Sequence, residues 1–494
     1  MTSPLTLLLP AVLGAPILWG PAVPLRPASS ASTPGAPALA RPQDEARAAL
    51  DKQLAWELEG LAERCQQAKA FVERNATYEL LLRFDPEHAK ARKTLGHKKD
   101  RKSGEWTVPE RSRPPKAAEE EIAAPLRAER ETLLRGHVDA VLVLLDGQEL
   151  PVRILRREEQ RLLELMPDHE GLRERTGEVR EGDSWVLRET VHARLTRKAH
   201  EKLRGDLKGA APDPAEAAIE AAEQTWGVTF SKALATPAVR VVSAVSDGEA
   251  SETAKRAHAT YAYLDQLLGT TDTLAQGTLY LFEGPAATAA FCQAYPGLEE
   301  ATRKLFGGLL CSYLDHHHAN ASSAKREERL DGAVRMSIAR HLAWTTGTWS
   351  KHGWIAEGFG IYITHQMTGT RLIYTVRESE GSSSKGGDKV EDRMKRKDAD
   401  WLALARTTLQ GKDAPKLAFT LGRDVNTLTR GDVLVANALA AYLLEGCEPG
   451  TALRVLKRIG RDEVGSAKAL EEELGLDPPA LERRLIRWLE ELGK

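Results

Sequence analysis

The spacing of apolar residues divides the chain into two regions with different patterns. From Arg41 to about Leu82, apolar residues recur every three or four positions among charged ones, as on the core-facing stripe of a helix. From Trp226 onward, short apolar runs alternate with helical patterns. The runs predict strands at 237–245, 277–282 and 307–314, and helices at 252–268, 286–295, 335–345, 354–367 and from 401 to the end. Strands and helices that alternate first, with helices gathered at the end, are typical of an α+β fold.

An internal repeat lies in the first region. The segment FDPEHAKARKTLGHKKDRKSGEW (84–106) returns as MPDHEGLRERTGEVREGDSW (166–185), and its Pro, His, Arg and Gly residues match at a constant offset of 81. The prolines suit the first turn of a helix and the glycines suit the position just past its end. The closing Trp would start a short strand or turn that packs back on that helix. The unit resembles the end of a tetratricopeptide-type helical hairpin with a small β-extension, and we interpret His88 and His169 as structural.

Between the two copies, Val138–Leu155 reads VDAVLVLLDGQELPVRIL. Two apolar runs on either side of Asp146-Gly147 predict a β-hairpin. We therefore expect residues 41–225 to form a helical and small-β accessory region that serves in docking or spacing.

The first 40 residues predict an export signal followed by a Pro/Ala-rich linker. Residues 3–24 are apolar with five prolines and no charge, and Ala38-Leu39-Ala40 has the small-x-small form of a cleavage site. No Lys or Arg lies near Met1, and a disordered tail or an uncleaved anchor is the alternative. We expect an exported protein, in the periplasm, the cell envelope or outside the cell. Further along, the Ser/Gly-rich and then charged stretch within 373–399 predicts a flexible loop.

Composition and charge exclude several classes of protein. The 494 residues carry 69 Lys and Arg against 71 Asp and Glu, a balance that argues against nucleic-acid coating and against binding to an anionic membrane by bulk charge. Past the N-terminus, no apolar run reaches the ~20 residues that span a bilayer. Four cysteines without a CxxC pair exclude a thiolate zinc ribbon. Cys292 and Cys311 are expected either to form a disulfide or to be buried thiols.

Histidine is concentrated in one part of the chain. Six of the 13 histidines fall within 50 residues: His316, His317, His318, His341, His352 and His365. Imidazole is a common metal ligand, so this segment is the first place to look for metal chemistry.

Within that segment, Trp354–Tyr362 (WIAEGFGIY) resembles the second zinc-ligand helix of gluzincin metallopeptidases. It is most similar to the peptidase MA-like families of uncharacterised bacterial proteins. The resemblance runs from Pro237 to the C-terminus and includes NALAAYLLEG (437–446). It implies a thermolysin-like α+β core at 226–372 and a helical subdomain at 400–494. It also implies that Glu357 is the third zinc ligand and that Trp354, Gly358 and Tyr362 are groove or packing residues.

The preceding helix lacks the zinc-binding motif that the resemblance requires. In H-E-x-x-H the two His bind zinc from one face of a helix and the Glu takes a proton from the bound water. The best register makes His341 the second His and puts Ser337 and Ile338 at the first His and the base. We therefore expect neither catalysis nor a zinc cofactor. His341 and Glu357 are interpreted as a vestigial ligand pair that hydrogen-bond each other across two packed helices.

Three hypotheses remain open. The leading one is an exported, catalytically inactive peptidase-like protein that binds or scaffolds an unidentified protein or peptide partner. The second is a divergent zinc hydrolase using His341, Glu357 and a third ligand from His316, His317 or His318. The third is a helical-repeat adaptor, which predicts no cleft between the helices at 336–345 and 354–367.

Overall fold

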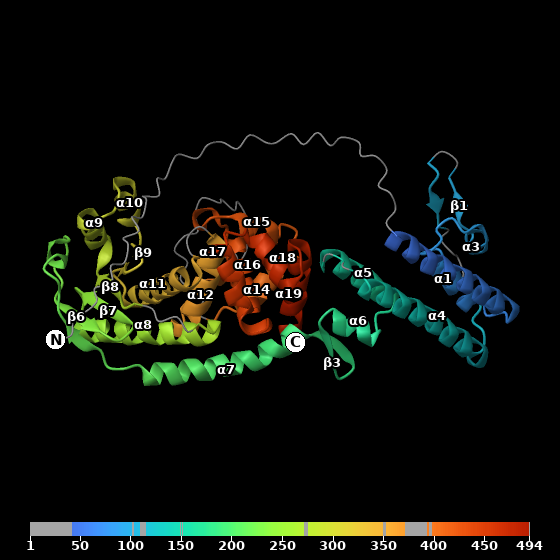
Figure 1. Ribbon diagram of the computed structural model, residues 1–494, viewed down its shortest axis with the longest axis horizontal. Helices are drawn as coiled ribbons and strands as arrows, with labels where there is room; N and C mark the ends of the chain where they lie inside the picture. Colours follow the sequence, from blue (N-terminus) through green and yellow to red (C-terminus); the bar gives the residue numbers. More distant parts are fainter. Residues whose placement is uncertain are drawn as a thin grey trace, which may run out of the picture.

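The computed structural model describes residues 42–100, 103–108, 115–148, 150, 152–270, 275–348, 352–370, 393–394 and 398–493. The predicted export segment at 1–40 and most of the predicted loop at 373–399 lie outside these residues. Figure 1 shows an accessory region at one end, a sheet with its helices at the other, and a helical bundle between them.

The accessory region is mainly helical, as predicted. Its helices are α1 (Pro42–Gln67), α2 (Phe71–Leu81), α3 (Ala89–Leu95), α4 (Glu120–Asp146), α5 (Val152–Leu165) and α6 (Glu170–Arg175). Two small ladders complete it, β1 (Lys98–Lys99) with β2 (Trp106–Thr107) and β3 (Glu178–Glu181) with β4 (Ser184–Leu187). Leu54, Leu58 and Leu61, from the predicted stripe of the first helix, are buried.

Both copies of the repeat use histidine as a helix cap. Nδ1 of His88 accepts a hydrogen bond from the Ala91 N–H, and Nδ1 of His169 accepts one from the Leu172 N–H, each at 3.2 Å. The helices therefore begin just after these histidines, and the prediction that the prolines lie in the first helical turn was wrong. Gly96 ends the first copy's helix with φ of 77°, a conformation that favours glycine.

Trp106, the closing tryptophan of the first copy, packs back on the helix before it, as predicted. The Arg92 guanidinium lies 4.9 Å from the centre of the Trp106 ring. The Trp106 indole N–H donates to Glu87 at 2.9 Å. These contacts join the small ladder to the helix before it.

The β-hairpin predicted at Val138–Leu155 is absent, and that prediction was wrong. The segment forms the end of α4 and the start of α5, with Gly147 directly after α4. Val138, Val141 and Leu145 are buried together at helical spacing. A continuous apolar run fits either a strand or a buried helix, and packing of the long helix decides between them here.

The six-stranded sheet is mixed. Its strands are β5 (Ala215–Ala217), β6 (Lys232–Ala235), β7 (Val239–Ser243), β8 (Gly277–Phe282), β9 (Cys311–Tyr313) and β10 (His318–Ser322), in the order β5-β6-β7-β8-β10-β9. β7, β8 and β10 are parallel, and the outer pairings are antiparallel. The sheet thus starts before residue 226, and it includes β10, whose small residues (HANAS) gave no strand signal.

Helices cover both faces of this sheet. Leu279 and Leu281 of β8 face α8 (Asp247–Leu268) and α11 (Arg326–Thr346), whereas Tyr280 and Phe282 face α9 (Gly284–Ala294). This two-residue alternation is what a strand buried on both faces requires. α10 (Glu300–Phe306) follows α9.

The remaining helices form a bundle around the largest hydrophobic core. They are α12 (Gly353–Thr368), α14 (Trp401–Gln410), α15 (Leu417–Gly422), α16 (Arg430–Ala441), α17 (Thr451–Gly460), α18 (Ser466–Leu474) and α19 (Pro478–Leu492), with a π-helical turn, η3 (Tyr442–Gly446), directly after α16. Short 3₁₀ turns lie at η1 (Glu223–Thr225) and η2 (Val425–Thr427). The α+β class and the helical C-terminal part are confirmed.

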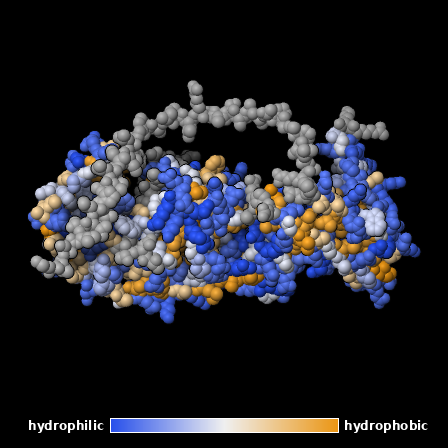
Figure 2. All heavy atoms as spheres, in the orientation of Figure 1, coloured by the Kyte–Doolittle hydropathy of each residue, from blue (hydrophilic) through white to orange (hydrophobic). Residues whose placement is uncertain are grey.

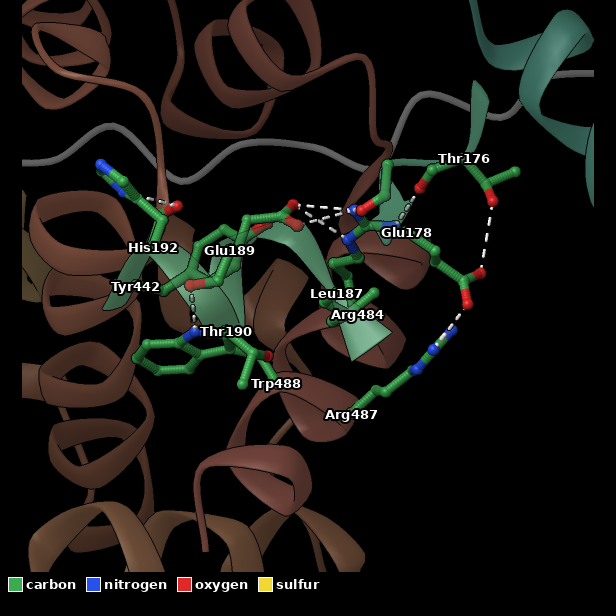
Figure 3. Close-up of polar contacts among 12 residues, drawn as sticks. Thr176, Glu178, Leu187, Glu189, Thr190, His192, Tyr442, Arg484, Arg487 and Trp488 are labelled. Atoms are coloured by element: carbon green, nitrogen blue, oxygen red, sulfur yellow. Dashed lines mark hydrogen bonds and ion pairs between the residues drawn. The ribbon is translucent and has the colours of Figure 1, made fainter. Parts of the chain in front are cut away.

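Helix α7 (Arg188–Ala210) connects the accessory region to the sheet and lies alongside α8 (Figure 1). At its start, a polar cluster joins the accessory region to α19 (Figure 3). Arg484 donates to both carboxylate oxygens of Glu189 at 2.9 Å, and Arg487 pairs with Glu178 at 2.7 Å. The Glu491 carboxylate accepts the Leu187 N–H at 2.8 Å. The accessory region is therefore fixed to the bundle by partly buried, charge-assisted hydrogen bonds.

Replacing Arg484 by methionine is expected to lower the free energy of unfolding by about 2 kcal/mol, because hydrogen bonds to charged groups contribute ~1.5–3 kcal/mol. The variant loses the bonds to Glu189 and to the carbonyls of Thr176 and Gly177. Urea denaturation measures the change. Arg483→Met, on the exposed side of the same helix, is the control. Equal stabilities of the two variants would contradict the role of this cluster.

Several large apolar side chains of the accessory region are exposed. Exposed large apolar side chains of the accessory region are Trp56, Val72, Val108, Ile122 and Val143, and Figure 2 shows apolar residues gathered over that end. Among the described helices, none combines the length and the apolar character that crossing a bilayer demands. All four cysteines are free, so of the two alternatives for Cys292 and Cys311 the structure has thiols.

Candidate functional site

The helices predicted to carry the zinc site, α11 and α12, pack directly on each other. Ile338 belongs to the same buried core as Trp354 and Phe359. The Trp354 indole N–H donates to the Ser466 hydroxyl at 3.0 Å. Gly358 lies against the backbone of α16, where an added Cβ would come 2.5 Å from the Ala436 carbonyl oxygen. Trp354 and Gly358 therefore serve in packing and do not line a groove.

Glu357 pairs with an arginine that the sequence reasoning did not single out. Nη2 of Arg335 lies 2.8 Å from Oε1 of Glu357, and both side chains are at most 4% exposed. Oε2 of Glu357 is buried without a hydrogen-bond partner. Gly360 makes room for the pair, because a Cβ there would lie 3.2 Å from Nε of Arg335. A fixed positive charge thus lies on the carboxylate that was predicted to be the third ligand.

His341 faces a different helix. Its Nε2 lies 2.8 Å from Oδ1 of Asp265 in α8, and its ring is fully buried. Burial works to raise the pKa of Asp265, but hydrogen bonds from His341 and Thr270 hold it below its ordinary value. The prediction that His341 and Glu357 hydrogen-bond each other was wrong. Arg335 and His341 are six residues apart on α11, hence ~9 Å along its axis and on different faces.

The remaining motif positions hold no ligand or base. Ser337 donates its hydroxyl proton to the Ala333 carbonyl at 3.0 Å, within its own helix. Ile338 is fully buried, and its hydrocarbon side chain accepts no proton. Neither position offers a group that could bind a metal or activate water.

The three adjacent histidines face three different partners. Nδ1 of His318 lies 3.0 Å from the Asp315 carboxylate. Nδ1 of His316 lies 3.3 Å from the Tyr313 hydroxyl, and the His317 ring lies 6.4 Å from that of Trp344. Within the described part of the chain, no group of three or more His, Cys, Asp or Glu side chains is placed to hold a metal ion. The residues present do not fit a gluzincin-type zinc site.

A polar cavity of about 310 Å³ lies between α7, α12, α14 and the end of α16. It is lined by Arg197, His200, Glu201, Arg204, Tyr362, His365, Gln366, Asp400, Trp401, Leu402, Asn437 and Glu445. Tyr362, predicted as a groove or packing residue, therefore does face a cavity. The sequence reasoning missed the α7 residues, although their spacing at 197, 200, 201 and 204 places them on one helix face.

One wall of the cavity is a buried network around Glu445. The Glu445 carboxylate accepts hydrogen bonds from the Tyr362 hydroxyl and from Nε of Arg197, the latter at 2.5 Å. Burial raises the pKa of Glu445, and burial together with the Glu445 charge raises that of Tyr362. Glu445 lies in the π-helical turn η3. Such one-turn insertions frequently occur at functional sites, and the sequence pattern does not reveal them.

Further along α7 and α12, Arg204 lies beside Gln366 in the same lining. Arg204 donates to the side-chain oxygen of Gln366. Among the described residues no carboxylate lies within ion-pair distance of it, although its charge acts to lower the pKa of Glu445. Burial, together with the charges of Arg204 and His192, lowers the pKa of His200 to about 4. Burial, Arg256 and Arg204 lower the pKa of Lys208 to about 8.

The depressed pKa of His200 predicts a loss of stability in mild acid. An unfolded His binds a proton near pH 6.5, whereas His200 in the folded protein does so only near pH 4. Between these values the unfolded state binds more protons, so stability falls as the pH falls. The His200→Asn variant is expected to lose less stability over this range in urea denaturation. Parallel stability curves for the two proteins would contradict this assignment.

Comparison with protein-family models, with curated proteins and with solved structures finds no match for this chain. The function must therefore be inferred from the side chains themselves. Two arrangements carry the argument: the closed ion pair between α11 and α12, and the polar cavity beside α7.

Proposed function

We propose that this chain is an exported, catalytically inactive metallopeptidase-like protein with a thermolysin-type core, which binds or scaffolds a protein or peptide partner. The observation that carries the proposal is the buried pair of Arg335 and Glu357, 2.8 Å apart. The guanidinium supplies the positive charge that a zinc ion would bring to this carboxylate, and it would repel a divalent cation at the same place.

The catalytic groups of the resemblance are also lacking. Zinc hydrolysis needs three protein ligands, an open position for water and a base beside that water. His341 is held by Asp265 at 2.8 Å, and Ile338 offers no base. These contacts stabilise the packing of three helices and provide no hydrolytic chemistry. Binding is then the activity that the peptidase-like core retains.

The accessory region supports the binding role. It is joined to the bundle by the cluster of Figure 3, which includes the Arg484–Glu189 and Arg487–Glu178 pairs. It also presents exposed apolar side chains such as Trp56, 69% exposed, and Val143, 73% exposed. A partner would meet one continuous body rather than two tethered parts. A helical-repeat adaptor accounts for the direct packing of α11 on α12 but not for the six-stranded sheet.

Metal content and hydrolysis of the purified full chain test the proposal. After incubation with zinc and desalting, elemental analysis is expected to find far less than one zinc per chain. Unfolded casein is expected to remain intact, with thermolysin as the positive control in the same assay. One zinc per chain, together with casein cleavage that His341→Ala abolishes, would overturn the proposal.

The export part of the proposal rests on the apolar stretch 3–24 and on Ala38-Leu39-Ala40. The N-terminal sequence of the protein recovered from the periplasm of an expressing bacterium tests it. The expected N-terminus is Arg41. Recovery of the intact chain from the cytoplasm alone would contradict export.

A further inference from the structure

We propose that the cavity beside α7 binds a small ligand through an oxyanion, a carboxylate or a phosphate, held by Arg204 and Arg197. The inference deepens the proposed binding function and rests on it, but its test involves no metal and no hydrolysis. The cavity, at about 310 Å³, has the volume of the smaller ligand pockets in proteins.

The polarity of the α7 face that lines the cavity is the first argument. Arg197, His200, Glu201 and Arg204 all line it, and each can form hydrogen bonds. A helix face turned toward the rest of the protein is normally apolar. α7 follows that rule at Ala193, Leu203 and Leu207, which pack on the hydrophobic core. The polar residues at 197, 200, 201 and 204 lie among these apolar ones and line the cavity.

The acidic groups in the walls already have partners or lie at the edge. Glu445 accepts from Tyr362 and Arg197. Oδ1 of Asp400 accepts the backbone N–H groups of Leu402 and Ala403 at 3.0 Å as a helix cap. Glu201 is exposed. None of these three is paired with Arg204.

The two arginines retain donors for a ligand. Arg204 contacts the neutral amide of Gln366, and Nη2 of Arg197 is buried without a hydrogen-bond partner. The planar guanidinium group matches a carboxylate or a phosphate with two parallel hydrogen bonds. An oxyanion is therefore the group that would neutralise Arg204 and satisfy the remaining donors.

Capping of α12 does not explain the position of Arg204. The last carbonyls of that helix accept from other cations, Gln366 O from Lys208 at 3.5 Å and Met367 O from Arg256 at 2.6 Å. Arg204 instead holds the Gln366 side chain at the cavity wall. Its charge is thus available to the cavity.

Isothermal titration of the full chain with three probes tests the proposal. The probes are inorganic phosphate, N-acetyl-Ala-Ala with a free carboxylate, and the same dipeptide as its C-terminal amide. We expect one of the two anions to bind with 1:1 stoichiometry and the amide not to bind. Binding of phosphate alone identifies a free anion as the ligand, and binding of the acid peptide alone identifies a peptide terminus.

Variants of α7 locate the binding. Arg204→Gln is expected to weaken it at least about tenfold. Lys202→Gln, on the exposed side of the same helix, removes the same charge and is expected to leave it unchanged. Arg204→Lys keeps the charge without the planar group and is expected to bind the anion more weakly than the wild type. If Arg204→Gln does not fold, this variant tests whether Arg204 holds the anion.

Two outcomes would overturn the inference: no binding of either anion up to about 10 mM, or equal losses in the Arg204 and Lys202 variants. Zinc-dependent casein cleavage alongside intact anion binding would instead overturn the proposed function alone. The two proposals therefore fail separately.

Discussion

Replacing Arg335 by methionine is expected to lower the free energy of unfolding by about 3–5 kcal/mol, because it leaves a buried carboxylate without its cation. Arg335 and Glu357 are almost fully buried, Arg335 bonds Oε1 of Glu357, and Oε2 has no hydrogen-bond partner. Urea denaturation monitored by circular dichroism measures the change. A variant that also carries Glu357→Leu is expected to recover most of the loss, because no buried charge then remains.

Arg326→Met provides the matched control on the same helix. Arg326 pairs with Glu252 at the surface, where its side chain is 61% exposed. Exposed ion pairs contribute only ~0–1 kcal/mol. Similar losses of unfolding free energy in the Arg335 and Arg326 variants would contradict the larger contribution expected of the buried pair.

Substitution of Gly358 by alanine is expected to cost about 3 kcal/mol, at the upper end of overpacking effects. The added Cβ would lie 2.5 Å from the carbonyl oxygen and 2.8 Å from the carbonyl carbon of Ala436. Both obstacles are backbone atoms, so α12 and α16 must separate to relieve the contact. The separation would loosen the core residues that both helices bury, and a thermal or urea denaturation curve measures the loss.

Gly205→Ala is the control for this substitution. Gly205 lies within α7, and a Cβ there would meet no atom within 4 Å. Alanine is favoured over glycine inside a helix by about 1 kcal/mol, so this variant is expected to be more stable than the wild type. A Gly358→Ala protein as stable as the wild type would contradict the close packing of the two helices.

The elements that the sequence predicted well have patterns that depend on local spacing alone. The stripe with Leu54 and Leu58 and the strand Gly277–Phe282 are examples, because burial of one helix stripe or of two strand faces repeats every few residues. The β-hairpin prediction for Val138–Leu155 was wrong because local spacing alone does not decide this case. Its apolar run suits either a strand or a buried helix, and here it continues the long helix α4. Gly96 was predictable because a positive φ selects glycine.

The candidate site was less predictable, since its contacts join residues far apart in the chain. His341 meets Asp265, 76 residues away, and Glu357 meets Arg335 from the preceding helix. Nothing in the local spacing ranks Asp265 above other acidic residues as a partner. The missing base at Ile338, by contrast, was visible at once, since it depends on residue identity alone. Histidine density found the right segment but not the role of its residues.

Helix α7 belongs to two parts of the molecule at once. Near its start, Glu189 binds Arg484 at the join to the accessory region, and about two to four turns further on Arg197 and Arg204 line the cavity. Because one helix carries both sets of contacts, a rotation of α7 at its join to the accessory region would also move the side chains of the cavity wall. By thermodynamic reciprocity, an anion that prefers one setting of α7 favours the corresponding setting of the accessory region to the same extent. Binding of an anion in the cavity would in this way change the position of the accessory region at the far end of the protein.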